Sequence, residues 1–131
     1  FLVTLMTNGY LLNHRHFSLF DKFPPKAIEI SLYGNTNETM SVMTRTKADP
    51  SKVIENIIHL KKIGIELFLK TVLTKANINE FKSYQNFAEL NNIHFRYDVA
   101  IHPRIDKKFP AKKCDFLQKR LKQLNLQTCL F

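Results

Sequence analysis

Glycine and cysteine are scarce in this chain of 131 residues, which has three glycines and two cysteines. The glycines lie far apart, at Gly9, Gly34 and Gly64, so none of them belongs to a glycine-rich phosphate-binding loop. Cys114 and Cys129 form no CxxC pair and are too few for a disulfide framework, which favours a reducing compartment. The sequence also has no apolar run near the roughly 18 residues of a membrane span. We therefore expect a cytoplasmic protein without a membrane segment.

Acidic residues are also few: the chain has eleven of them against twenty basic residues, which gives a net charge of +9. Eight basic and two acidic residues lie between Arg104 and Lys122, so this short stretch holds most of the surplus. Basic surfaces bind nucleic acid or anionic membranes. A basic amphipathic tail is more often a solvated helix face, so we do not expect nucleic-acid or membrane binding. A basic nucleic-acid-binding α/β domain is the alternative that this tail leaves open.

Apolar runs and breakers predict strands that alternate with helices along the chain. The predicted strands lie at about 1–6, 27–33, 65–73 and 93–101, and the predicted helices at 11–22, 51–63, 78–91 and 113–125. The stretch 36–46 is typical of a short helix or an ordered loop. Strands separated by helices of this length imply parallel neighbours joined by right-handed crossovers. The fold class predicted is therefore α/β.

Three local signals fix the ends of these helices. Asp49 before Pro50 supplies an N-cap and a first-turn proline, and Gly64 supplies the C-terminal stop of the same helix. Asn77, followed three residues later by Glu80, has the spacing of a capping box. The sequence thus predicts a capped helix on each side of the third strand.

Two of the predicted strands carry ionisable residues on one face. Ile28 and Ile30 alternate with Glu29, and Arg96 alternates with apolar neighbours in the last strand. A parallel sheet with helices on both faces should be apolar on both, so this pattern predicts a polar cleft or lumen. The residues expected to line it are Glu29, Lys70, Arg96, Asp98 and His102. The alternatives are a solvent-exposed face, or a face paired internally as Lys70–Glu29 and Arg96–Asp98.

Five segments in order resemble a known family: TLMTNG, EISLYG, HLKKIGIEL, LKTVLTKAN and FRYDVAIHPR. They are similar to the later strands of radical S-adenosylmethionine enzymes, particularly SPASM-type and other peptide-modifying maturases. The resemblance covers about residues 1–106 and implies about four βα units of a partial (β/α)6 TIM-like barrel. Residues 107–131 would then form a basic amphipathic C-terminal helix or tail.

In that family S-adenosylmethionine lies across the ends of the strands. The resemblance places the cofactor-binding turn at Thr7, Asn8 and Gly9, and the family's serine at Ser31. It also implies that Arg45 lies near the cofactor carboxylate, and that Thr71 and Asn77 border the cofactor or substrate. The other reading of these residues is structural: an ordinary turn, ordinary strand residues, a surface charge and an N-cap.

The family's cluster motif, CxxxCxxC, and its GGEP-like segment are not found in this sequence. The resemblance therefore implies a [4Fe–4S] cluster in a full-length parent, and a fragment that is not catalytically competent alone. Its expected partners are S-adenosylmethionine and a peptide or small-molecule substrate. A further reading is a remnant or split subunit, completed by a partner chain that supplies the N-terminal strands.

Overall fold

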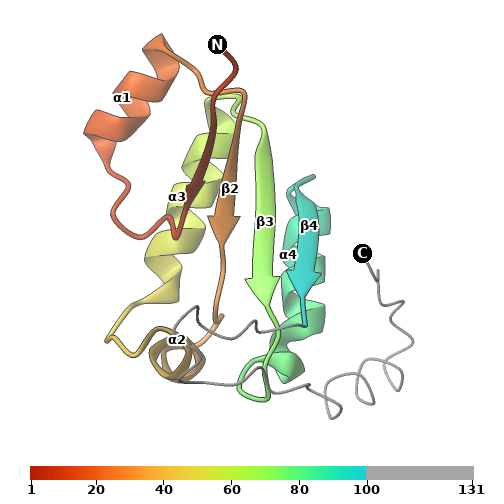
Figure 1. Cartoon of the computed structure of the whole chain (residues 1–131). Helices are drawn as coiled ribbons and strands as arrows, with labels where there is room; N and C mark the ends of the chain where they lie inside the picture. Colours follow the sequence, from red (N-terminus) through yellow and green to blue (C-terminus); the bar gives the residue numbers. More distant parts are fainter. Residues whose placement is uncertain (100–131) are drawn as a thin grey trace, which may run out of the picture.

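The computed structural model describes residues 1–99 and contains a four-stranded, fully parallel sheet (Figure 1). The strands are β1 (Thr4–Thr7), β2 (Ala27–Ser31), β3 (Leu67–Val72) and β4 (His94–Asp98), and their order in the sheet is β1-β2-β3-β4. The α/β fold class predicted from the alternation is confirmed. His102, the basic stretch 104–122 and the predicted helix 113–125 lie outside the described residues.

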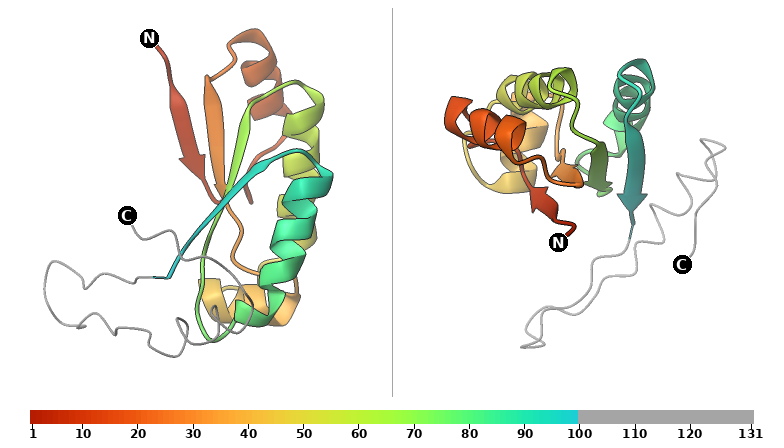
Figure 2. Two further views of the ribbon diagram at one scale, coloured as in Figure 1. Left: turned by 90° about the vertical axis from the view of Figure 1, so that its right-hand side faces the viewer. Right: turned by 90° about the horizontal axis from the view of Figure 1, so that it is seen from above.

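Four helices connect these strands: α1 (His14–Lys22), α2 (Asn37–Thr44), α3 (Pro50–Lys62) and α4 (Phe81–Leu90). A 3-10 turn, η1 (Ile78–Glu80), leads into α4. Seen from above, the helices lie on one side of the sheet (Figure 2). In Figure 1, α2 lies beyond the carboxyl end of β2. Within residues 1–99, no helix is both long and apolar enough to cross a membrane.

The hydrophobic core lies between the sheet and these helices. Alternate residues of β2 and β3 point toward the helices, because side chains on a strand alternate between its faces. Full burial of an aliphatic side chain contributes about 1.5–3 kcal/mol, so this layer supplies much of the stability. Its main members are Ile28, Ile30, Val53, Ile57, Leu60, Leu67 and Leu69, each no more than 3% exposed.

The predicted ends of α3 are confirmed. The Asp49 side chain accepts a hydrogen bond of 2.9 Å from the Ser51 backbone N–H, as an N-cap should. Gly64 follows the last turn with φ +82, the left-handed conformation in which glycine costs least. Local signals therefore determine both ends of this helix.

The predicted capping box at the start of η1 is wrong. Asn77 makes no side-chain cap, and its Oδ1 instead accepts a 2.8 Å hydrogen bond from the Thr74 N–H. Its amide Nδ2 donates to the carbonyls of Tyr33 and Val72 at 3.3 and 3.0 Å. Glu80 bonds to the segment after β2. Asn77 and Glu80 thus each bond to the segment after β2, at Tyr33 and Asn35, instead of capping the helix.

Candidate functional site

One face of the sheet carries the ionisable residues and, within residues 1–99, has no helix over it (Figure 2). The strand register aligns these residues in rows across the sheet, and register neighbours share a face. One row is Met6, Glu29, Phe68 and His94; the next is Ser31, Lys70 and Arg96; Val72 and Asp98 form a third. We call this surface the open face.

Two ion pairs cross the open face. Arg96 donates to Glu29 across the intervening strand β3, and Glu29 is only 7% exposed. The Lys70 ammonium lies 2.9 Å from Asp98. Burying the Glu29 carboxylate requires Arg96 as its partner, since an unpaired buried charge is costly. The charged side chains of the open face are therefore paired with one another, and all of them except Glu29 are partly exposed to solvent.

The partners differ from the pairing Lys70–Glu29 and Arg96–Asp98 considered from the sequence. Register gives the reason: Glu29 lies opposite Phe68, whereas Lys70 lies opposite Ser31 and Arg96. The long Arg96 side chain extends diagonally to Glu29. Lys70 is left to pair with Asp98, one row further along β4.

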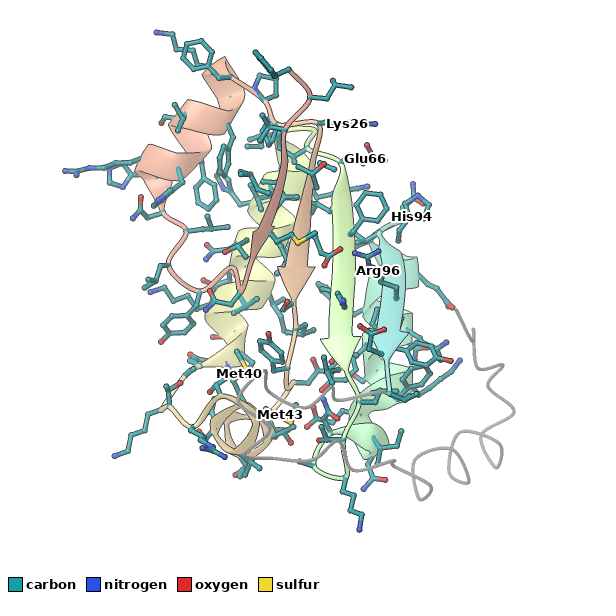
Figure 3. The ribbon with its side chains drawn as sticks, viewed as in Figure 1. Lys26, Met40, Met43, Glu66, His94 and Arg96 are labelled. Carbon is teal, nitrogen blue, oxygen red and sulfur yellow. The ribbon has the colours of Figure 1, made fainter. Side chains whose placement is uncertain are left out.

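An aromatic pair lies beside these charges. The rings of Phe68 and His94 stack with centroids 5.4 Å apart and an interplanar angle of 20°. His94 and Arg96 both extend from β4, two residues apart on the same face (Figure 3). The open face thus offers charged groups and ring surface to a polar ligand.

The turn after β1 has a defined shape. Thr7 Oγ1 accepts from the Gly9 N–H and Asn8 Oδ1 from the Tyr10 N–H, each at 3.1 Å. Gly9 has φ +71, a conformation that side chains disfavour. The Asn56 amide of α3 donates 2.8 Å to the Gly9 carbonyl, which anchors the turn to the helix layer. Asn56 was not singled out from the sequence, because its partner lies 47 positions away.

Ser31 and Arg45 belong to different elements, the strand β2 and the end of the helix α2. Ser31 is the last residue of β2 and lies half-buried on the open face, opposite Lys70. Arg45 is the exposed C-cap residue of α2 in the left-handed conformation, with φ 57. Parallel strands end at one edge, so Ser31 and the Thr7–Gly9 turn lie on neighbouring strand ends.

Two of the residues expected at the cofactor or substrate do not lie on the open face. Thr71 follows Lys70 and so points to the opposite, helix-covered side, where it is 1% exposed. Its hydroxyl has no hydrogen-bond partner among residues 1–99. Asn77 is fully buried, and its amide is used to hold the ends of β2 and β3. Both side chains are therefore buried near the carboxyl end of β3, and their contact with the cofactor or substrate stays a prediction.

Glu80 is a residue whose role the sequence pattern misassigned. Its Oε2 accepts from the Asn35 N–H and the Tyr84 hydroxyl, both at 2.7 Å. Its Oε1 accepts from the hydroxyls of Thr39 and Thr36, at 2.7 and 3.2 Å. The capping-box spacing pointed to Glu80 but not to these partners, which lie on the segment after β2.

These contacts change the ionisation of two groups. Burial acts to raise the pKa of the Glu80 carboxyl, but the hydrogen bonds from Asn35, Thr39, Tyr84 and Thr36 outweigh it and hold that pKa below its ordinary value. Burial, together with the neighbouring Glu80 carboxylate, raises the pKa of Tyr84 far above the ordinary tyrosine value. Glu80 is therefore a carboxylate, and Tyr84 a neutral donor, across the usual pH range.

No group of three or more His, Cys, Asp or Glu side chains within residues 1–99 has the arrangement of a metal site. A CxxxCxxC motif needs three cysteines, and the sequence has two. The residues of this chain therefore do not fit the [4Fe–4S] cluster that the family resemblance implies.

Solved structures with a similar fold were found for this chain, and so was one protein that is similar in sequence. The fold is similar to that of Streptococcus suis SuiB bound to S-adenosylmethionine, with a TM-score of 0.63 and 18% identity over 95% of this chain and 29% of that one. A second structure of Streptococcus suis SuiB matches with a TM-score of 0.62 and 14% identity, over 95% of this chain and 31% of that one.

In sequence, the chain is 32% identical over 102 residues to a "Probable GTP 3′,8-cyclase" of Sulfolobus acidocaldarius. The matched part is 77% of this chain, and the chain spans about a third of that relative's length (32%). No family model matches the chain. The likeness to SuiB shows the partial α/β barrel fold of residues 1–99.

Proposed function

We propose that this chain is part of a radical S-adenosylmethionine enzyme and that the carboxyl edge of its sheet binds S-adenosylmethionine. Three observations support the proposal: the five-segment resemblance, the similarity to a probable GTP 3′,8-cyclase, and the fold likeness to a protein bound to S-adenosylmethionine. The observation that carries it is geometric. A parallel sheet with helices on one face leaves its other face and its carboxyl edge available to a ligand.

The residues at this edge fit the ligand's chemistry. The Thr7–Asn8–Gly9 turn lies at this edge, and it is held there because Gly9, which has no side chain, packs closely against Ile30 and Val53. Ser31 adds a hydroxyl from the neighbouring strand. We assign these residues to the cofactor, and Arg45 to its carboxylate. When bound, S-adenosylmethionine supplies, on reductive cleavage, the hydrogen-abstracting chemistry of the family.

The open face would hold the substrate. Lys70, Arg96 and Asp98 present charge of both signs, with Glu29 buried beneath as the partner of Arg96, and the Phe68–His94 stack presents ring surface. We propose a peptide or another polar small molecule as the substrate class, in the cytoplasm. The cluster that delivers the electron would be held by residues outside this sequence. In this scheme, residues 1–106 form one barrel-like unit, and residues 107–131 form a basic tail.

A calorimetric titration of the 131-residue chain with S-adenosylmethionine tests the binding proposal. We expect saturable binding that weakens when Ser31 is replaced by alanine. Loss of one hydrogen bond costs about 1 kcal/mol, so the dissociation constant should rise by roughly fivefold. Ser18→Ala, on the exposed side of α1, is the matched control. Equal affinity in wild type and Ser31→Ala, or no binding at millimolar ligand, would contradict the proposal.

A second proposal, the docking of a partner chain, rests on the outer edge of β1. β1 pairs with β2, and within residues 1–99 nothing pairs with its other edge. A largely apolar groove beside β1 is lined by residues of β1, the loop after it, α1 and β2, including Leu5, Met6, Leu11 and Phe20. An unpaired strand edge is a template for another strand. We propose that a chain segment supplying further barrel strands docks here.

Met6 is the residue that reports this docking. It is 75% exposed on β1, and a docked strand would cover it. Replacing Met6 with lysine should prevent co-purification of a strand-donating partner, whereas Leu90→Lys, at the exposed end of α4, should not. A chain that stays monomeric in sedimentation and captures no such partner would argue against this reading.

A further inference from the structure

The segment between β2 and α2 is tied to the start of α4 by one carboxylate. Glu80 lies at the end of η1, and its three donors on the other segment are Asn35, Thr36 and Thr39. These donors are 41 to 45 positions away in sequence. A carboxylate offers about four lone-pair sites, and here both oxygens accept two bonds each. The carboxylate is therefore fully used within the fold.

The bonds to the backbone and hydroxyls of this segment fix its conformation. The Asn35 N–H lies outside any helix or strand, and Glu80 satisfies it at 2.7 Å. The Thr36 hydroxyl also accepts from the Thr39 N–H at 3.1 Å, as the N-cap of α2. Glu80 thus supports the first turn of α2 at the same time as the loop before it.

Two further contacts hold α2 and the loop before it against α4 and the loop after β3. Asn35 Nδ2 donates to Ser83 Oγ at 2.8 Å, and the Thr74 hydroxyl lies 3.2 Å from the Met43 sulfur. Met40 and Met43 lie on α2, near the carboxyl ends of the strands (Figure 3). Gly34 packs against the α2 backbone so closely that an added Cβ would lie 2.5 Å from the Met40 nitrogen. The segment has little freedom to shift without breaking the Glu80 bonds.

We propose that Glu80 is a positioning residue that, through Asn35, Thr36 and Thr39, holds the segment following Ser31 in the conformation that binds S-adenosylmethionine. The ligand part of this proposal rests on the proposed function. Ser31 precedes Asn35 by four residues, so the anchored amide and the proposed cofactor-binding hydroxyl belong to one short stretch. Arg45, the residue proposed for the cofactor carboxylate, ends the helix that this stretch begins.

The titratable group that bonds to Glu80 is Tyr84, which donates to it. The other charged side chains on α2, on α4 and in the turn before η1 are exposed: Glu38, Lys75, Lys82 and Glu89. A pH titration of the Asn35 amide therefore reports Glu80 in the acidic range.

The anchoring is tested by the Asn35 amide proton in NMR spectra recorded between about pH 2 and pH 6, across the ordinary glutamate pKa of about 4.3. In wild type the resonance should titrate with a midpoint below that value. Glu80→Gln preserves shape and most hydrogen bonding but cannot ionise, so its Asn35 resonance should not titrate. Glu89→Gln, on the exposed side of α4, should behave as wild type. An Asn35 resonance that is unaffected by pH, or still titrates in Glu80→Gln, would overturn the anchoring.

The ligand part is tested by calorimetry with S-adenosylmethionine. Glu80→Ala should weaken binding by about tenfold, as expected for loss of a charge-assisted hydrogen bond. Glu80→Gln should restore most of the affinity, and Glu89→Gln should match wild type. Binding that is equal in wild type and Glu80→Ala would overturn the positioning role. Failure of the wild type to bind would overturn the proposed function and the ligand part, while the Asn35 titration still decides the anchoring.

Discussion

The Glu29 carboxylate on β2 and the Arg96 guanidinium on β4 meet across β3, so one ion pair spans three strands of the sheet. Glu29 is buried, whereas more than half of the Arg96 side chain is exposed. The ion pair thus joins a buried carboxylate to an arginine that remains largely open to solvent.

Replacing Arg96 with alanine should lower the free energy of unfolding by about 2–3 kcal/mol, because the buried Glu29 carboxylate loses its partner. Denaturant unfolding at neutral pH measures this change. Arg15→Ala, at an exposed position of α1, should change stability by less than about 0.5 kcal/mol. The double variant Glu29→Gln with Arg96→Ala should recover part of the loss. No recovery would mean that lost packing of Arg96 explains the effect.

Three glycine-to-alanine variants should form a graded series. At Gly64 an added Cβ meets nothing within 4 Å, so only the left-handed backbone costs stability, about 1–2 kcal/mol. At Gly9 the same backbone cost is joined by contacts of 3.1 Å to Ile30 and 3.4 Å to Val53. Gly34→Ala should be the most damaging, since its Cβ would meet the α2 backbone. Thermal unfolding ranks the three, and Gly64→Ala being the least stable would contradict the packing described.

Asn56→Ala should destabilise the turn after β1. The change removes a buried donor and leaves the Gly9 carbonyl without it, which costs about 1–3 kcal/mol. Asn86→Ala, at an exposed position of α4, is the matched control. Hydrogen exchange at the Gly9 and Tyr10 amides should accelerate in Asn56→Ala. Unchanged exchange there would show that the turn holds its shape without α3.

Alkaline pH should weaken the fold through Tyr84. Its pKa is raised in the folded state, so its stabilising contribution is complete below the ordinary tyrosine value of about 10 and falls as pH rises beyond it. Between about pH 9 and 11, the free energy of unfolding should therefore fall more steeply in wild type than in Tyr84→Phe. Equal slopes in wild type and Tyr84→Phe would contradict the burial of Tyr84.

Local and periodic features of this fold were predictable from the sequence. The alternation of Ile28 and Ile30 with Glu29 predicted two unlike faces, and Asp49 and Gly64 marked the ends of α3. Each signal depends on neighbours within four residues. The alternation also placed Lys70 on the polar face and Thr71 on the opposite face, although the family resemblance implied that Thr71 borders the cofactor or substrate.

Partners distant in sequence were not predictable. The pairing of Glu29 with Arg96 depends on strand register, and the Glu80 bonds depend on how α2 packs beside η1. Asn77 and Glu80 have the spacing of a capping box, yet Asn77 donates to the Tyr33 carbonyl 44 positions away, and Glu80 accepts from the Asn35 N–H 45 positions away. Burial raises the cost of unsatisfied donors, so those long-range bonds prevail over the local ones.

The order β1-β2-β3-β4 means that every hydrogen-bonded strand pair is also a pair of consecutive strands in the chain. Each βα unit of residues 1–99 therefore adds to one growing edge, and no strand of this part of the chain inserts between two that are already paired. Such a sheet can lengthen or shorten by whole units in evolution without re-pairing the strands that remain. Excision of β2 would be different, because it alone joins β1 to the other described strands.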